Sequence, residues 1–209
     1  MSETYDFKKA YQDLYLPKQK PMTVDLPNML FLSVDGKGNP NGQEYQDAVS
    51  ALYSIAYNIK MSKMGTSRPA GYFDYVVPPL EGLWWTPGPF ELFEREDWLW
   101  TSMIRQPEFV TQQTIEWAKE QSAKKKPELD VSKVSLIEFE EGLCVQMLHL
   151  GPYLTEPETL AVMHRYMESQ NLKDEVGSVR KHHELYLNDP RRTTPDKLKT
   201  VLRHPVGKQ

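Results

Sequence analysis

The chain lacks disulfide-forming cysteine pairs, long apolar segments and a signal peptide, the features that mark secreted and membrane proteins. A single cysteine, Cys144, cannot form a disulfide within the chain, and its apolar surroundings, GLCVQML, predict a buried and unreactive thiol. No segment approaches the roughly 20 apolar residues that cross a bilayer. The N-terminus, MSETYDFKKAYQDLYLPKQKP, carries acidic residues and lacks the apolar stretch of a signal peptide. We therefore expect a cytoplasmic protein that does not contact membranes.

Positive charge is also scarce, because 25 Lys and Arg residues stand against 29 Asp and Glu residues, for a net charge of −4. This balance argues against a general nucleic-acid surface. A lysine run at 124–126 comes near the end of a predicted helix, where it complements the helix dipole. We expect no direct nucleic-acid partner.

Common catalytic and metal-binding motifs are missing as well. The segment GKGNPNG has no Lys-Ser/Thr pair after its last glycine, so it predicts a turn and not a phosphate-binding loop. No G-x-S-x-G motif is present. His182 and His183 are adjacent and would point to opposite faces of a strand, and the five histidines show no metal-ligand spacing. These absences predict a protein with no metal and no cofactor.

Aromatic residues are abundant, with five Trp, eleven Tyr and seven Phe. Many of them lie in GYFDYVVPPLEGLWWTPGPFELFEREDWLW. Core packing accounts for any one of these rings equally well. Their density within one stretch nevertheless exceeds what a core strand requires and favours an aromatic binding surface.

Hydrophobic periodicity predicts an alternation of strands and helices. Residues 28–38 have the pattern of a strand that ends in a glycine turn, and a helix is expected from Gln43 to about Gly65. Thr155 and Glu158 suggest a capping box that begins a helix through about Ser169. Other expected elements are strands at about 72–77, 83–86 and 98–104, a helix within 105–127, strands on both sides of 140–142, and strands in HHELYLNDP and LKTVLRHPV.

Two pairs of segments suggest an internal repeat. EGLWWTP (81–87) aligns with ELYLNDP (184–190), and MIRQP (103–107) aligns with VLRHP (201–205) at nearly the same separation. The sequence therefore predicts an α+β fold, in which two βαββ units surround a pseudo-twofold axis with a cleft between them. The expected organisation is an N-terminal arm (1–20) and one domain (21–209), with a first half (21–107), an inserted helix (108–127) and a second half (130–209).

Glu184 is the candidate functional residue. On a strand it shares a face with Tyr186 and Asn188, while the repeat places Glu81, Leu83 and Trp85 on the matching face of the first half. A carboxylate against aromatic walls suits general acid–base chemistry, or the binding of cationic or flat ligands. The alternative is that Glu184 is a solvated residue paired with Arg180 or Arg203.

Specific segments resemble the GyrI-like small-molecule-binding family. HHELYLNDPRRTTPDKLKTVLRHPV, preceded by HLGPY and TEPETL, resembles its C-terminal half. MLFLSVDGKGNPNGQEYQDAVSALYSIAYNIK and YVVPPLEGLWW resemble its N-terminal half in the stand-alone branch, so the resemblance covers roughly residues 20–207. It implies two βαββ (SH2-motif-like) units, and an aromatic cleft whose glutamate meets cationic, hydrophobic compounds; Glu184 is the matching residue.

The stand-alone branch includes cyclopropanoid cyclopropyl hydrolases, which detoxify DNA-alkylating compounds of the yatakemycin and duocarmycin type. By this resemblance, Glu184 and Tyr186 would activate and orient water without a cofactor. Flat substrates would lie against tryptophan rings. The expected substrate-binding residues are Trp85, Trp98, Trp100, Tyr53, Tyr57, Tyr153 and Asn188.

Other functions remain open at this level. A protein with the same site could sequester cationic or aromatic compounds without turnover. A third function, gyrase binding, would require an exposed acidic surface and leaves the tryptophan cluster unexplained. We expect no room for a helix-turn-helix domain, which leaves a free-standing enzyme or binder that is a monomer or a homodimer.

Overall fold

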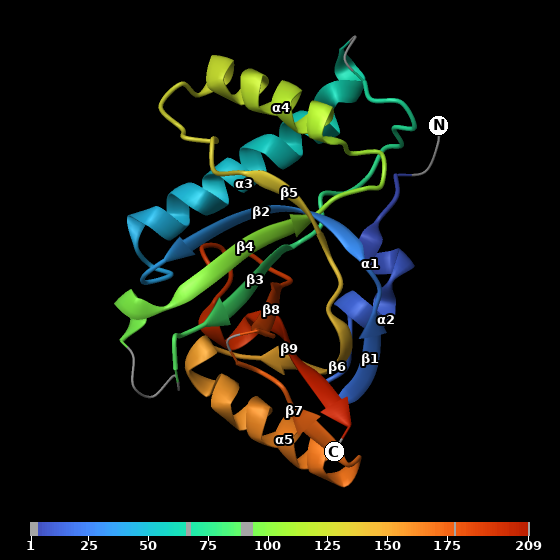
Figure 1. The fold of residues 1–209 in the computed structure, drawn as a ribbon, viewed down its shortest axis with the longest axis vertical. Helices are drawn as coiled ribbons and strands as arrows, with labels where there is room; N and C mark the ends of the chain where they lie inside the picture. Colours follow the sequence, from blue (N-terminus) through green and yellow to red (C-terminus); the bar gives the residue numbers. More distant parts are fainter. Residues whose placement is uncertain (1–3, 66–67, 89–93, 178, 209) are drawn as a thin grey trace.

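One antiparallel sheet runs through the whole molecule (Figure 1). The computed structural model describes residues 4–65, 68–88, 94–177 and 179–208. Nine strands form the sheet in the order β1-β6-β9-β8-β3-β4-β2-β5, with β7 paired to β9. The described strands are β1 (Met22–Leu26), β2 (Met29–Lys37), β3 (Leu80–Trp85), β4 (Leu99–Arg105), β5 (Ser135–Phe139), β6 (Gly142–Leu150), β7 (Leu172–Asp174), β8 (His182–Tyr186) and β9 (Lys199–Lys208).

Helices cover the sheet at both ends of the long axis. In Figure 1, α3 and α4 lie at one end and α5 at the other. The described α-helices are α1 (Phe7–Ala10), α2 (Gln12–Tyr15), α3 (Gln43–Met61), α4 (Gln112–Lys125) and α5 (Glu156–Ser169). None of the helices in these described ranges combines the length and the apolar composition that a bilayer crossing requires.

The strand order is symmetric about the β8–β3 pair: β8 matches β3, β9 matches β4, β6 matches β2 and β1 matches β5. This symmetry confirms the predicted pseudo-twofold relation between two α+β units. Each half supplies two strands, a helix and two more strands, and the second half has the short strand β7 in addition. The first strand of each half crosses over, so β1 pairs with β6 and β5 pairs with β2. The two halves therefore share one sheet, and β3 and β8 meet at its centre.

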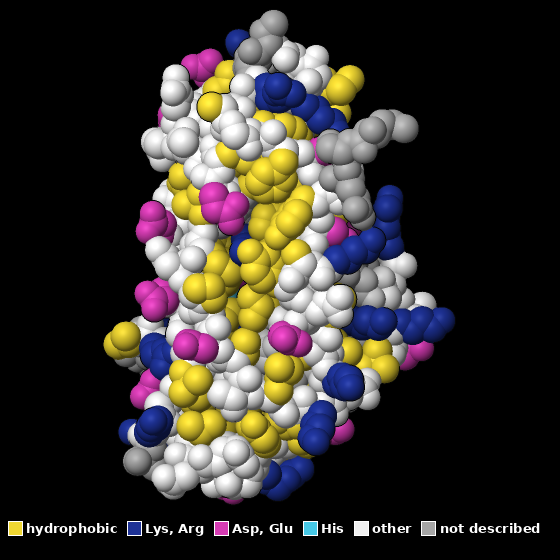
Figure 2. All heavy atoms as spheres, turned by 90° about the vertical axis from the view of Figure 1, so that its right-hand side faces the viewer, with side chains coloured by type: hydrophobic (Ala, Val, Ile, Leu, Met, Phe, Trp, Pro, Cys, Tyr) yellow, Lys and Arg dark blue, Asp and Glu magenta, His cyan; other side chains and the backbone are white. Residues whose placement is uncertain are grey.

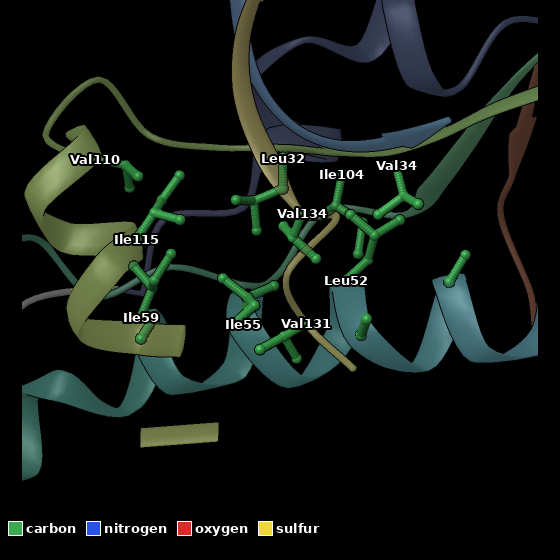
Figure 3. Close-up of a cluster of buried hydrophobic side chains, with 14 of the residues drawn as sticks. Leu32, Val34, Leu52, Ile55, Ile59, Ile104, Val110, Ile115, Val131 and Val134 are labelled. Carbon is green, nitrogen blue, oxygen red and sulfur yellow. The ribbon is translucent and has the colours of Figure 1, made fainter. Parts of the chain in front are cut away.

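The largest core lies between α3 and one face of the sheet (Figure 3). The apolar positions of α3 recur every three or four residues, and Leu52, Ile55 and Ile59 are fully buried against Leu32 and Ile104. A second core packs Met163 and Met167 of α5 against Leu202 on the same face. Both helices therefore cover the face that also carries Tyr186 and Glu184, since these residues lie opposite Leu80 and Leu202 in the registers.

The N-terminal segment covers the opposite face. Phe7 and Tyr15, from α1 and α2, are buried against Leu185 and Val201. On the side of the molecule where this segment lies, hydrophobic side chains form a band with charged groups beside it (Figure 2). The sequence correctly placed Leu185 on the face away from Glu184. The helices that cover Leu185 are the short N-terminal helices α1 and α2, and not the long helices α3 and α5.

Beneath these short helices lies a buried ionic cluster. His183 places Nδ1 2.9 Å from Glu141 and Nε2 3.1 Å from Glu81, and Arg203 lies 3.1 Å from the same Glu141 oxygen. Tyr15 donates a hydrogen bond to Glu81 at 3.3 Å. Burial opposes ionisation of Glu141, but the charges of His183 and Arg203 outweigh it and hold its pKa at about 2.

Three local predictions were wrong. Residues 72–77 do not form a strand of the sheet. The backbone of Tyr5 hydrogen bonds to Asp74 and Val76 there, which gives an isolated β-bridge. The Thr155 hydroxyl donates to the Pro152 carbonyl, so it makes no capping box with Glu158. The helix expected within 105–127 excludes Pro107 and begins at Gln112, where Thr111 and Thr114 form the capping box.

Cys144 is buried, as the sequence predicted. Burial raises the pKa of its thiol far above the ordinary value, and the nearby negative charge of Glu141 adds to the effect. A thiol in this state is a poor nucleophile, so Cys144 is a packing residue.

Candidate functional site

Glu184 and Tyr186 lie on β8 at the centre of the sheet, on the face that α3 and α5 cover at either end. The register places Glu184 opposite Gly82 and Tyr186 opposite Leu80. Residues that face each other in an antiparallel pair project to the same side. Because Gly82 has no side chain, Trp84 and Tyr186 can lie over it; a Cβ atom at this position would lie 2.8 Å from Trp84 Nε1 and 3.1 Å from the Tyr186 hydroxyl oxygen.

Aromatic rings surround this pair. The Trp84 indole N–H donates to the Tyr186 hydroxyl at 2.9 Å. Tyr153 meets the Tyr186 ring edge-on, with centroids 6.2 Å apart. Trp84 in turn contacts Trp98 at 6.0 Å and Tyr45 at 5.5 Å. Tyr45 comes from α3 and Tyr153 from the segment before α5, so both halves of the protein contribute to the cluster.

Glu184 is half-buried and has one described side-chain partner, His182, whose Nε2 lies 3.1 Å from its Oε1. Its charge acts on the neighbouring tyrosines. Burial and the negative charge of Glu184 raise the pKa of Tyr186 and of Tyr153 well above the ordinary value. Burial likewise raises the pKa of Tyr45 to about 12, against the opposing effect of a hydrogen bond with Ser102. All three phenols are therefore neutral hydrogen-bond donors at physiological pH.

Glu156, the first residue of α5, is a member of the cluster that the sequence analysis missed. Burial raises the pKa of its carboxyl to about 9, and the charge of Glu184 adds to the effect. One of its carboxyl oxygens is buried without a hydrogen-bond partner among the described residues. The site therefore pairs a neutral carboxylic acid with a carboxylate. The sequence places Glu156 close to Tyr153 in GPYLTEPE, which could have indicated that it belongs to the site. The segment was instead interpreted only as a helix cap.

The predicted aromatic walls are only partly brought together. Trp98 and Tyr153 lie in the cluster. Trp85 projects from the opposite face of β3, because it follows Trp84 directly, and the Lys181 ammonium lies 4.2 Å from its ring. Trp100 shares the face of Glu184 but is 1% exposed within the α3 core, so its ring is a packing residue.

The remaining predicted contacts lie at the edge of the site or outside it. Tyr53 is half-buried on α3, with the Tyr57 ring 6.2 Å away, and Tyr57 is 52% exposed. The Asn188 amide donates to the Lys197 carbonyl at 2.9 Å and accepts from the Lys199 amide at 3.1 Å. Asn188 thus joins the ends of β8 and β9.

The repeat alignment had the wrong strand phase. It equated Glu81 with Glu184, but Glu81 lies opposite Leu185 and belongs to the buried ionic cluster on the other face. A twofold axis perpendicular to the sheet keeps each side chain on its own face, so these two glutamates cannot be symmetry counterparts. Trp84, and not Trp85, is consequently the tryptophan of β3 that reaches the site.

The alternative pairing of Glu184 with arginine is also excluded among the described contacts. Arg180 pairs with Glu175, and Arg203 with Glu141. The Glu184 cluster consists of Glu184, Glu156 and the rings of Tyr45, Trp84, Trp98, Tyr153 and Tyr186. A hollow of about 320 Å³ lies elsewhere, between Asp35, Asp47, Lys133 and Trp100, and none of these cluster residues lines it. In the described part of the chain, His164, Asp174 and His204 are the group of potential metal ligands, and they lie beyond His182.

Comparison with known proteins gives a consistent result. The sequence model of the GyrI-like small molecule binding domain matches residues 19–206. A crystal structure of a hydrolase from Listeria innocua is 54% identical, covers 98% of this chain and 100% of its own, and superposes with a TM-score of 0.92. An uncharacterised conserved protein from the same organism is 57% identical over 98% and 100% of the two chains, with a TM-score of 0.94.

A more distant structure shares the fold alone. The C-terminal domain of EcmrR is 10% identical, with coverage of 91% of this chain and 98% of its own and a TM-score of 0.54. Among curated proteins, no relative matches the chain.

Proposed function

Because the chain belongs to the GyrI-like small-molecule-binding family, we propose that it binds a flat aromatic compound at the Glu184 cluster and hydrolyses it there. The observation that carries this proposal is the pair formed by Glu184 and Glu156. A carboxyl group that keeps its proton, beside a second carboxyl group, allows one to serve as acid and the other as base in one reaction. The hydrolase from Listeria innocua, at 54% identity, supports the same reaction class.

The proposed substrate class is a cyclopropanoid DNA-alkylating compound, and the proposed role is detoxification. In such a compound the strained ring is conjugated to a carbonyl group. The oxygen of water attacks the exposed CH2, the ring C–C bond breaks, and its electron pair makes the carbonyl ring an aromatic phenolate. Release of strain and gain of aromaticity drive the reaction, so the protein has to bind, orient and transfer protons.

Glu184 and Glu156 carry out the two proton transfers of this mechanism. Glu184 takes one proton from the attacking water, and neutral Glu156 gives its proton to the phenolate oxygen. Transfer of the proton from Glu184 back to Glu156, directly or through water, restores the starting state. General acid or base catalysis contributes about 10²- to 10⁴-fold, and the Tyr186 hydroxyl is available to hydrogen bond the water or the oxyanion.

The test is multiple-turnover hydrolysis of a duocarmycin-type cyclopropanoid, followed by chromatography. We expect turnover well above one per protein, with a loss of about 100-fold or more in Glu184→Gln. Glu168→Gln, an exposed glutamate on α5, is the matched control and should keep full activity. Tight binding without product in the wild type would refute hydrolysis of this substrate class.

A second function, sequestration without turnover, is favoured by one specific feature. Aromatic rings of Tyr45, Trp84, Trp98, Tyr153 and Tyr186 gather around a negatively charged carboxylate, an arrangement that attracts flat cations. Fluorescence titration with a cationic aromatic dye tests it. Saturation at one dye per chain, weakened at least tenfold in Glu184→Gln and without any chemical change in the dye, would support sequestration.

A further inference from the structure

Two imidazoles and a carboxylate converge where α5, β7 and β9 meet. Asp174 Oδ2 lies 3.0 Å from His164 Nε2 and 2.7 Å from His204 Nδ1. Each of the three residues offers one ligand atom that lies within 4.8 Å of the other two. We propose that His164, Asp174 and His204 form a binding site for a divalent transition-metal ion, with Zn²⁺ the best match.

The chemistry of the donor atoms selects the class of metal. Imidazole nitrogens combined with one carboxylate oxygen suit Zn²⁺ and its first-row neighbours, whereas Ca²⁺ and Mg²⁺ take oxygen ligands. Three protein ligands leave one tetrahedral position for water. The His164 side chain is 49% exposed, so the ion can enter from solvent, while His204 is buried on β9.

The two spacings that involve Asp174 require only a small adjustment. With metal–ligand bonds of about 2.0–2.2 Å, two ligands on a tetrahedral ion lie about 3.3 Å apart. The two contacts of Asp174 Oδ2 are shorter than this by a few tenths of an ångström. The His164 side chain is exposed on α5, so the surrounding protein leaves it room to rotate toward an ion.

The hydrogen-bond balance beyond His204 also calls for a cation. His204 Nε2 lies 2.7 Å from His182 Nδ1, and His182 Nε2 lies 3.1 Å from Glu184. The chain from Asp174 to Glu184 thus has three contacts, but two neutral imidazoles supply only two N–H groups. With both carboxylates ionised, one contact brings two lone pairs together.

A metal ion removes this conflict. When His204 Nδ1 binds the ion, its Nε2–H donates to His182, and the Nε2–H of His182 donates to Glu184. Every atom of the chain is then satisfied without an additional proton. This is the arrangement in which a ligand histidine donates its second N–H to a fixed outer partner. An ion at this site therefore orients the carboxylate of the Glu184 cluster through two imidazoles.

Metal binding here requires no hydrolytic activity, so binding itself is the test. Calorimetric titration of the full chain, free of any polyhistidine tag and treated with chelator, should show one Zn²⁺ per chain with a Kd of about 10 µM or tighter, weaker than a four-ligand structural site. His164→Ala should weaken binding at least tenfold. His164 is exposed, so thermal unfolding should show that the variant remains folded. Glu168→Gln, one helical turn further along α5, is the matched control and should bind as the wild type does.

Two further variants sharpen the result. Asp174→Asn should also weaken Zn²⁺ binding, and its visible Co²⁺ spectrum should lose the intensity of a four-coordinate site. His182→Ala, which removes only the outer partner, should weaken binding by about tenfold. Absence of saturable binding in the wild type, or equal affinity in the wild type and His164→Ala, would overturn the proposal.

Discussion

Trp84 and Tyr186 are 102 positions apart in the sequence, yet the indole N–H of Trp84 donates to the Tyr186 hydroxyl oxygen at 2.9 Å. An indole is a donor only, so the hydrogen of the Tyr186 hydroxyl remains available for another acceptor. The negative charge of Glu184 lies near enough to raise the pKa of this hydroxyl. The contact across β3 and β8 therefore fixes a neutral donor beside the candidate base.

Tyr186→Phe tests this relationship, because it keeps the ring and removes the hydroxyl. The indole N–H of Trp84 loses its acceptor, which costs about 1–2 kcal/mol of unfolding free energy. Turnover, or ligand affinity, should fall by about tenfold or more, since a hydrogen-bond donor is lost. Urea unfolding and steady-state kinetics measure the two effects. Tyr57→Phe, in which the ring is half exposed on α3, should change neither; equal values for Tyr186→Phe and wild type would remove Tyr186 from the site.

Glu156→Gln should stabilise the fold at alkaline pH while it lowers activity. The folded-state pKa of Glu156, about 9, is above its ordinary value of 4.5. Between these values the folded state holds a proton that the unfolded state has lost, so stability falls as pH rises through this window. Glutamine removes this dependence and should raise the unfolding free energy at pH 8 by about 1 kcal/mol or more.

Urea unfolding at pH 5 and pH 8 measures this change, and Glu158→Gln, an exposed glutamate on the same helix, is the control. Turnover of Glu156→Gln should fall, because an amide cannot give up a proton to the product. A pH dependence identical to that of the wild type would show that Glu156 ionises normally.

The buried ionic cluster predicts a loss of stability in acid. Glu141 has a folded-state pKa of about 2 against an ordinary value of 4.5, so its contribution is complete above 4.5 and is lost as pH falls toward 2. A difference of this size corresponds to about 3 kcal/mol. Burial opposes protonation of His183, but Glu141 and Glu81 outweigh it and raise its pKa. Its contribution is therefore complete below about 6.5 and is lost as pH rises through the raised value.

Glu141→Gln should flatten the acid limb of the unfolding free energy, measured by urea titration between pH 2 and pH 7. It should also lower stability at pH 7 by about 3–5 kcal/mol, because His183 and Arg203 lose their shared partner. Glu138→Gln, a surface residue of β5, should preserve the acid limb. An acid limb of unchanged depth in Glu141→Gln would assign the effect to other carboxylates.

Gly82→Ala tests the space opposite Glu184. The new methyl group would lie 2.8 Å from Trp84 Nε1 and 3.1 Å from the Tyr186 hydroxyl, so one of these side chains has to move. We expect a loss of about 1–3 kcal/mol in unfolding free energy, typical of overpacking, and weaker ligand binding. Gly177→Ala, which adds a methyl group with no atom within 4 Å, is the control. Wild-type affinity in Gly82→Ala would show that the ligand does not require the observed positions of these rings.

Much of the fold was accessible from the sequence because its periodicities are strong. The apolar spacing over residues 43–65 predicted α3, where Leu52, Ile55 and Ile59 are fully buried. Alternation along HHELY placed Glu184 and Leu185 on opposite faces of one strand, and the registers of β8 confirm this. The helix start at Gln112 was missed, since capping depends on which hydroxyl meets which backbone N–H.

By itself the sequence determined the two-unit α+β fold, the face of β8 on which Glu184 lies and the richness of the chain in aromatic residues. Only the tertiary structure decided which rings reach Glu184. Relative strand phase is set by cross-strand pairing, and a shift of one residue exchanged Trp84 for Trp85. The same holds for Glu156 and for the group of His164, Asp174 and His204. Their proximity arises where distant segments pack together, a relation that no local pattern encodes.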